Sequence, residues 1–308
     1  MAKSPPFLAQ SFTAMGSPCE LKLHADSRSR LRHLMARAEA EVRRLEARYS
    51  RYRDDSFLSE INRVAATGGR IEVDAETSGI LDYVATCHAE SEGLFDVTSG
   101  VLRKAWKFQQ ATLPDPGEIR SLVDCVGWHR LTWQRPWLIF SEPGLELDLG
   151  GAVKEYAVDR VAQLLLEAGI SSGLVNLGGD IRVIGPQPDG TGWRIGIRHP
   201  RQPGRFIGTF ALAQGAMASS GDYERCLVVE GQRYGHVLNP KTGWPVRHLA
   251  SVSVLADFCV VAGSASTIAM LKETEGPKWL DSLGVSYFWV DVEGRTGGSP
   301  DFSGLSSS

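Results

Sequence analysis

The sequence has 308 residues, a formal net charge of −3, 43% hydrophobic residues and 22% charged residues. These values are ordinary for a globular protein and give no reason to expect nucleic acid or an anionic membrane as a partner. No stretch reaches the roughly 18 consecutive apolar residues of a membrane span, and residues 1–6 lack the apolar core of a signal peptide. The five scattered cysteines are typical of reduced thiols. We predict a cytoplasmic protein, unless a leader segment precedes this sequence.

In the first half of the chain, the spacing of apolar residues predicts both helices and strands. An opening strand is expected over residues 9–24, and a long amphipathic helix over 27–49. A second helix is expected to begin after Asp74, with Asp74 or Thr77 as its cap. A loop is expected at 113–117, and two strands at 137–140 and 145–149. An arginine cluster on and after the long helix predicts a solvated face: Arg43, Arg44, Arg48, Arg51 and Arg53.

In the second half, strands predominate. A helix is expected from Val153 to a stop at Gly169. The strands that follow are expected at 173–175, 181–184, 193–198, 206–212, 226–229 and 250–255. Helices are then expected over 261–272 and from Pro277, with a last strand at 285–290. Without a steady βαβ alternation, this order predicts an α+β fold with mainly antiparallel sheets. We expect one domain over 9–292, built of two intimately packed subdomains, and a flexible tail over 293–308.

The segment from Leu147 to Asp159 carries the strongest local signal for a ligand. It has the pattern of a buried strand that stops at Gly150 and Gly151 and turns directly into a helix. Asp148 precedes the glycines, and Lys154 falls in the first helical turn. Free backbone N–H groups, the helix dipole and a lysine in one small volume suit a phosphorylated ligand. An ordinary tight strand-to-helix turn is the alternative, and this segment alone leaves both open.

Other polar clusters stand at the ends of apolar runs. Asp180 follows a glycine pair, Asp222 lies in a dense polar turn, and His236 precedes a Pro/Gly loop. Asp180 and Asp222 would also fit turns that they stabilise locally, and a lone histidine is more often structural than catalytic. The sequence contains no P-loop, no G-x-G-x-x-G after a strand, no G-x-S-x-G and no H-x-x-x-H pair.

Taken in order, these segments resemble the ApbE family of FAD:protein FMN transferases, from about Met15 to Leu271. The resemblance implies an ApbE-like fold with a ligand cleft between the two subdomains. It also implies binding of FAD and Mg²⁺ and transfer of FMN to a threonine hydroxyl of a target flavoprotein, with release of AMP. The matching segments are Met15-Gly16, 52–62, Phe95-Asp96, 148–159, 175–180, 220–225 and 236–243.

The resemblance also implies roles for single residues. His236 would be the general base that takes the threonine proton. Lys154, together with the N–H groups at Gly150 and Gly151, would stabilise the phosphoryl oxygens. The cofactor-binding residues would be Met15, Tyr52, Leu94, Phe95 and Asp96 around the flavin and adenosine, Asp148 and Lys154 at the nucleotide, and Val237 packed against it.

The chain departs from the family pattern at the metal. The last long helix in this family typically begins Ala-Asp, with a threonine four residues after the acid; here Gly263 replaces that acid. Ser266 stands where some members have a second acid, and Asn239 where an aspartate is common. Thr267 and a backbone carbonyl near Gly151 remain as ligands, although Mg²⁺ prefers anionic oxygens.

Three outcomes follow from this departure. The metal enters only with the pyrophosphate of FAD; or Asp257, Asp180 or Asp222 supplies the missing charge; or the protein binds FAD as a carrier or regulator without transfer. FAD pyrophosphatase activity, with water in place of threonine, is a further alternative.

Overall fold

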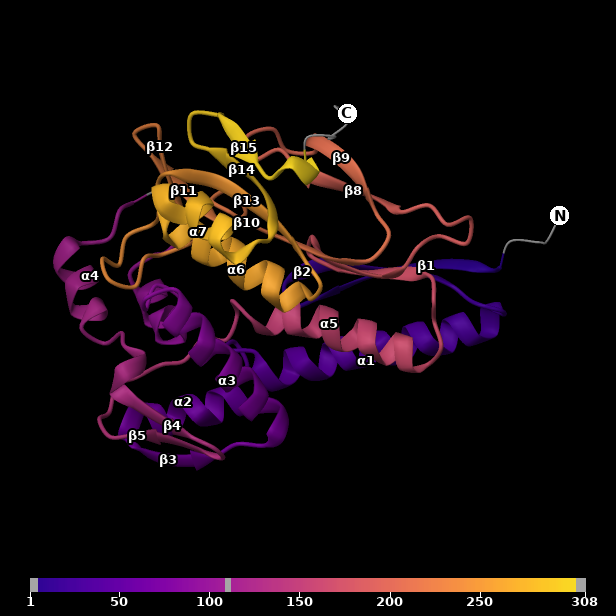
Figure 1. Cartoon of the computed structure of the whole chain (residues 1–308). Coiled ribbons are helices and arrows are strands. Elements are labelled where there is room, and N and C mark those ends of the chain that lie inside the picture. Colours follow the sequence, from indigo (N-terminus) through magenta and orange to yellow (C-terminus); the bar gives the residue numbers. More distant parts are fainter. Residues whose placement is uncertain (1–4, 109–111, 303–308) are drawn as a thin grey trace.

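A computed structural model describes residues 5–108 and 112–302 (Figure 1). The α-helices are α1 (Arg28–Tyr49), α2 (Phe57–Thr67), α3 (Ala75–Glu90), α4 (Pro116–Val123), α5 (Val153–Glu167), α6 (Cys259–Leu271) and α7 (Gly276–Leu283). The strands are β1 (Phe7–Ala14), β2 (Ser17–His24), β3 (Gly69–Glu72), β4 (Leu131–Gln134), β5 (Trp137–Phe140), β6 (Gly173–Leu177), β7 (Asp180–Gly185), β8 (Trp193–Arg198), β9 (Phe206–Leu212), β10 (Gly215–Gly221), β11 (Cys226–Val229), β12 (Gln232–Gly235), β13 (Leu249–Ala256), β14 (Ser286–Asp291) and β15 (Thr296–Gly298).

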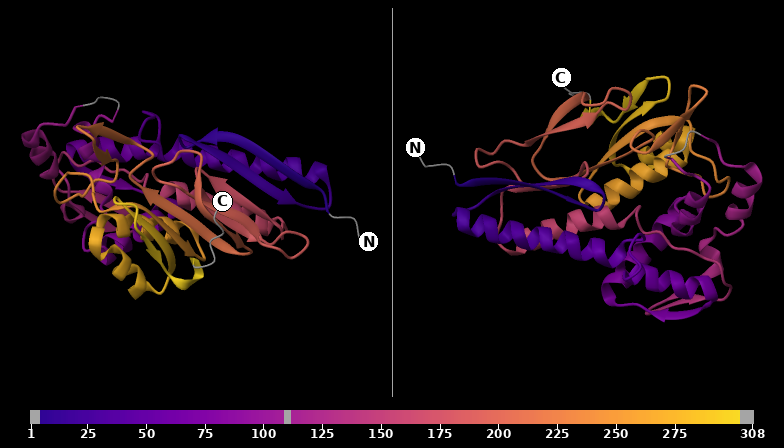
Figure 2. Two further views of the ribbon diagram at one scale, coloured as in Figure 1. Left: turned by 90° about the horizontal axis from the view of Figure 1, so that it is seen from above. Right: turned by 180° about the vertical axis from the view of Figure 1, so that it is seen from behind.

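The largest layer is an eight-stranded sheet in the order β1-β2-β6-β7-β10-β13-β14-β15. Helices α1, α5 and α6 lie together against this sheet (Figures 1 and 2). Their apolar stripes and the sheet residues facing them form the main core. The hairpin β8–β9 adds a second, smaller core with residues from β6, β7 and β10. Every named strand pair in the described chain is antiparallel, so the expected α+β class with mainly antiparallel sheets is confirmed.

The second part of the molecule holds α2, α3 and the three-stranded sheet β3-β5-β4 (Figure 1). The side chain of Asn62 joins α2 to the chain that leads into α5, because it bonds both the N–H and the carbonyl of Leu147. The two parts share one continuous core. None of the helices in the described part of the chain has the length and apolar character that a bilayer span requires.

Local signals predicted several helix ends. The side chain of Ser27 caps α1, which begins where the long helix was expected, and Asp74 rather than Thr77 caps α3. Gly169, with φ +80°, follows the end of α5. These helix ends fix where the loops of the candidate site begin and end.

The structure corrects other expectations. Residues 9–24 form a hairpin rather than one strand, because Met15 and Gly16 have φ values of 52° and 68°, as in a two-residue hairpin turn. Residues 145–149 form no strand. Within the expected flexible tail, Thr296–Gly298 pairs with β14 and Phe302 is buried. Residues 303–308 lie outside the described chain. Strands β3, β4, β10 and β12 were not predicted.

Candidate functional site

The glycine turn before α5 is held by Asp148. Its Oδ1 accepts a hydrogen bond from the Gly150 N–H at 2.9 Å, and its Oδ2 forms an ion pair with Arg51. Arg51 also donates to the hydroxyl of Tyr52 at 2.7 Å. Asp148 therefore fixes the shape of the turn and links it to the end of α1.

The aromatic residues predicted at the flavin have different exposures. Tyr52 is 72% exposed, whereas Phe95 is 5% exposed. A Cβ atom added to Gly151 would lie 3.4 Å from the Phe95 ring, so this ring packs directly beneath the turn. Leu94 packs partly buried beside it. The position of Tyr52 suits stacking on a ligand, and that of Phe95 suits support of the glycine turn.

Asp96 organises its own loop. Its Oδ1 accepts hydrogen bonds from the N–H and the hydroxyl of Thr98, and its Oδ2 accepts one from the Trp128 N–H at 3.0 Å. The carboxylate is buried, and these partners occupy both of its oxygens. Its role at the cofactor stays a prediction.

The hairpin turn at Met15 and Gly16 lies beside the Arg225 guanidinium, which a Cβ atom on Gly16 would approach to 3.7 Å. The N–H of Met15 donates to Glu46 of α1 at 2.5 Å, which fixes the turn. Arg225 also interacts with Tyr52: although burial raises the pKa of Tyr52, bonds from Arg51 and Arg225 lower it overall. The turn, Tyr52 and Arg225 thus meet in one place.

His236 lies one residue beyond the last pair of the β11–β12 ladder, Cys226 and Gly235. Burial lowers the pKa of His236, and the charges of Arg225 and Lys154 lower it further while Glu224 opposes them. Within the described residues, its Nδ1 atom is buried without a hydrogen-bond partner. The lowered pKa favours the neutral imidazole, and its Nδ1 atom is buried and unpaired among these residues. Val237 packs next to it against the main core.

Lys154 lies at the start of α5, with its Nζ 2.6 Å from Oδ2 of Asp180 at the beginning of β7. Although burial lowers the pKa of Lys154, Asp180 and Glu155 raise it overall, so the amine stays charged. A Cβ atom on Gly178, in the turn before β7, would lie 3.9 Å from this Nζ. The predicted lysine is thus fixed between the glycine turn and the turn at Gly178-Gly179.

A groove adjoins this second turn. It has a volume of about 270 Å³, and it is lined by Gly178, Gly179, Arg198, Ser219, Tyr223 and Glu224, among others. Its other lining residues come from β2, β6, β7, β8, β9, β10 and β13, and Lys154 is not among them.

A residue that sequence reasoning missed, Glu155, completes the cluster. It is 8% exposed, and its Oε2 has no hydrogen-bond partner in the described part of the molecule. Burial raises the pKa of Glu155 to about 7; Asp180 adds to the rise and Lys154 opposes it. Glu155 lies on the stripe of α5 that holds Val158, Asp159 and Ala162, all buried. An acid on a buried stripe is the sequence signal that would have identified it.

The acids expected to replace the missing metal ligand are placed differently. Asp222 forms a two-bond ion pair with Arg201 at 2.6 and 2.8 Å, and Asp257 is exposed. Asp180 pairs with Lys154. Asn239 accepts bonds from the N–H groups of Lys241 and Thr242 and so closes its own turn. Of the three acids, only Asp180 therefore lies in the cluster around Lys154.

Of the remaining predicted metal donors, Thr267 lies on α6 and Gly151 in the turn before α5. Thr267 shares a short hydroxyl network with Ser220 and Ser266, in which both contacts of Ser220 are 2.8 Å. No group of three or more His, Cys, Asp or Glu side chains in the described residues could hold a metal. A hydroxyl, a carbonyl near Gly151 and the buried Glu155 oxygen are nonetheless hard oxygen donors of the kind that Mg²⁺ accepts alongside substrate phosphates.

Comparisons with known proteins place this chain in a family. The model of the ApbE family matches residues 15–289. An FAD:protein FMN transferase from Rhodobacter capsulatus is 30% identical over 289 residues, which cover 91% of this chain and 54% of that protein. One from Haemophilus influenzae is 31% identical over 240 residues, covering 74% of this chain and 69% of the relative. This chain thus spans about half of the first relative and about two thirds of the second.

Solved structures agree with this placement. The ApbE protein of Thermotoga maritima superposes with a TM-score of 0.88 at 27% identity, covering 98% of this chain and 100% of that one. The flavin transferase ApbE of Vibrio cholerae superposes with a TM-score of 0.86, also at 27% identity and with 98% and 100% coverage.

Proposed function

This chain belongs to the ApbE family, and we propose that it is an FAD:protein FMN transferase whose acceptor is a threonine hydroxyl of a flavoprotein. The proposal rests on His236 and Lys154, which are distant in sequence, although the charge of Lys154 acts on the imidazole and lowers its pKa. Each has the protonation state that phosphoryl transfer needs: a neutral imidazole with a free nitrogen and a charged amine. The cytoplasmic location belongs to this proposal.

His236 is the proton acceptor in this scheme. The threonine oxygen forms a bond to the FMN-side phosphorus as its proton passes to the imidazole. The bond from that phosphorus to the bridging oxygen breaks, and AMP leaves. A base of lowered pKa is unprotonated at neutral pH, as this role requires.

Lys154 and the glycine turn act on the phosphates. The lysine stays charged beside Asp180. In the turn, the Gly150 N–H already bonds Asp148, and the N–H groups of Ala152 and Val153 bond the Leu149 carbonyl, so the N–H of Gly151 and the amine of Lys154 would face a bound anion. These groups would stabilise charge on the phosphoryl oxygens as the bond to AMP breaks. Tyr52, exposed beside Arg225, offers an aromatic face to one of the FAD rings.

A divalent metal ion, when bound, supplies further neutralisation of the pyrophosphate charge. The residues that would hold it are Thr267, through its hydroxyl, and Gly151, through its carbonyl. This metal site is part of the proposal.

The test is to incubate the protein with FAD, Mg²⁺ and a flavoprotein domain that carries a candidate threonine, and to weigh the acceptor. We expect a mass gain of one FMN and one AMP released per modified acceptor. FAD bound without any turnover would instead identify a carrier or regulator, and free FMN without an acceptor would identify a pyrophosphatase. Either result overturns the transferase proposal.

A further inference from the structure

The starting observation is the close approach of Gly263 on α6 to Glu155 on α5. A Cβ atom built on Gly263 would lie 2.5 Å from Cγ of Glu155 and 3.2 Å from its Oε1. Side chains do not approach so closely, so any residue other than glycine at 263 would displace Glu155. The Glu155 side chain therefore occupies the space that a side chain at position 263 would otherwise fill.

Asp159 sets the register that produces this contact. Its two carboxylate oxygens accept hydrogen bonds from the N–H groups of Cys259 and Val260, each at 2.9 Å, at the start of α6. One turn back along α5 leads to Glu155, and one turn forward along α6 leads to Gly263. One further turn along α6 leads to Thr267, and Gly151 lies in the turn just before α5 begins at Val153. Glu155 thus follows Gly151 by four residues in sequence, and its side chain faces Gly263, which is one turn from Thr267.

We propose that Glu155 supplies the anionic metal ligand of this site, in place of an acid at position 263, and that Gly263 is glycine to make room for it. The inference deepens the proposed function, on which the presence of a metal at this site rests. The ligand class is a divalent cation that prefers oxygen, such as Mg²⁺ or Mn²⁺.

The electrostatics of the cluster support this assignment. Glu155 and Asp180 are two buried acids, and the single amine of Lys154 pairs with Asp180. A buried carboxylate without a positive partner is costly, and a bound divalent cation would offset that cost. Among the described residues, Oε2 of Glu155 and Oδ2 of Asp180 are both buried without a hydrogen-bond partner; Oδ2 of Asp180 has the ion pair with Lys154, which leaves Oε2 of Glu155 as the oxygen for a metal.

The test measures binding of Mn²⁺, alone and with FAD, by the electron paramagnetic resonance signal of the free ion. Glu155→Gln keeps the size of the side chain but removes its charge, and we expect it to weaken Mn²⁺ binding about tenfold or more. Glu167→Gln changes an exposed acid on the same helix and serves as the matched control, with no change expected.

A reciprocal exchange tests the position of the charge. Gly263→Asp alone forces Glu155 aside, so we expect a lower melting temperature. The double variant Glu155→Gly with Gly263→Asp moves the carboxylate to the facing helix, and we expect it to regain most of the Mn²⁺ affinity and stability. Wild-type affinity in Glu155→Gln overturns the inference, as does a double variant that folds but binds no better than Glu155→Gly.

The two proposals fail in different ways. If the wild type transfers FMN while Glu155→Gln binds Mn²⁺ normally, the metal inference is wrong and the function stands. If Mn²⁺ binding depends on Glu155 but no acceptor gains FMN, the function is wrong and the metal site stands.

Discussion

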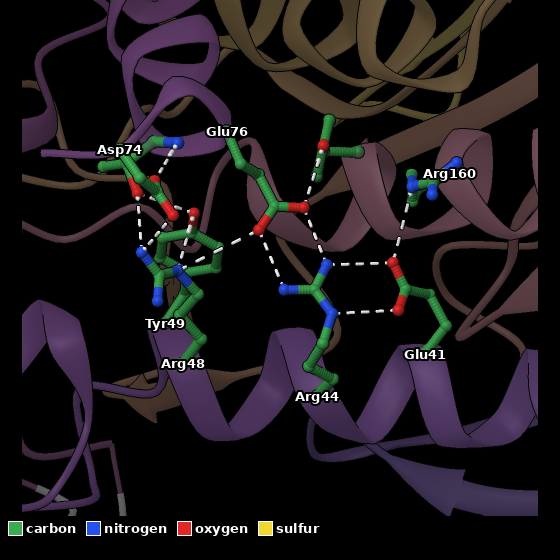
Figure 3. A network of polar contacts seen from close by, with 9 residues as sticks. Glu41, Arg44, Arg48, Tyr49, Asp74, Glu76 and Arg160 are labelled. Carbon is green, nitrogen blue, oxygen red and sulfur yellow. Dashed lines mark hydrogen bonds and ion pairs between the residues drawn. The ribbon is translucent and has the colours of Figure 1, made fainter.

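Two polar clusters border α5, and they differ in how their charges are matched. The outer cluster joins α1 to α3 and α5 (Figure 3). In it, Arg44 donates to Glu41 and Glu76 at 2.7–2.9 Å, and Arg48 bonds Asp74 at 2.7 Å. The inner cluster holds Lys154, Asp180 and Glu155, with one cation for two acids.

The two glutamates show what this difference means. The hydrogen bond from Arg44 lowers the pKa of Glu41, whereas burial raises the pKa of Glu155 to about 7. The outer acid is fully satisfied by the protein, so its role is to hold helices together. The inner acid lacks a cation of its own, as expected of a group whose partner arrives with the ligand.

The largest expected effect is at His236. His236→Asn should lower the rate of FMN transfer by about 10²- to 10⁴-fold, because it removes the general base. FAD affinity should stay within about twofold, since the imidazole acts on the acceptor proton rather than on binding. AMP release with a fixed acceptor measures the rate. His33→Asn, on the exposed face of α1, is the control. Full activity in His236→Asn would contradict the assignment.

The next effect is at Lys154. Lys154→Met should weaken FAD binding and lower the free energy of unfolding by about 3 kcal/mol, because it leaves Asp180 buried without its partner. Titration calorimetry and denaturant unfolding measure the two quantities. Combining it with Asp180→Asn should recover much of the stability but not the FAD affinity. Recovery of both would mean that Lys154 is only a structural partner of Asp180.

Stability should also depend on pH through Glu155. Its pKa is about 7 in the folded protein against an ordinary value of 4.5, so the folded state binds more protons between these values. Below pH 4.5, Glu155 is protonated in both the folded and the unfolded state, so its charge does not lower the free energy of unfolding. This destabilising effect grows as the pH rises to about 7. In metal-free protein, Glu155→Gln should raise the melting temperature by a few degrees at pH 8 and by little at pH 5. An equal gain at both pH values would contradict this titration.

The smallest effect belongs to the outer cluster. Arg44→Met should lower the free energy of unfolding by about 0.5–1 kcal/mol, because the pairs it breaks are partly exposed. FAD and Mn²⁺ binding should not change. A loss of either would show that the outer cluster is coupled to the site and would remove the contrast between the two.

Local signals predicted much of the fold. The apolar stripe of α1, the Asp74 cap of α3 and the glycine after α5 each act within a few residues. The errors involve partners distant in sequence. Residues 145–149 have the apolar alternation of a strand, but their backbone at Leu147 pairs with the side chain of Asn62. Strand β10 is rich in small residues, and only its place between β7 and β13 makes it a strand.

The site divides in the same way. Lys154 and His236 stood out because each begins or ends a recognisable segment. Glu155 lies next to Lys154 in the same segment, yet its proposed role follows from its contact with Gly263, which lies on another helix. From the sequence, glycine at position 263 indicated that the metal site lacks an acid. The packing of α5 against α6 shows that the side chain of Glu155 lies in that space.

The most direct test of this account is a crystal structure with FAD and Mn²⁺, read by the anomalous signal of the metal. We expect the metal to contact the Glu155 carboxylate and the FAD pyrophosphate, with Lys154 on the phosphate oxygens and His236 facing the FMN-side phosphorus. A metal bound away from Glu155, or a pyrophosphate remote from Lys154 and His236, would contradict the account.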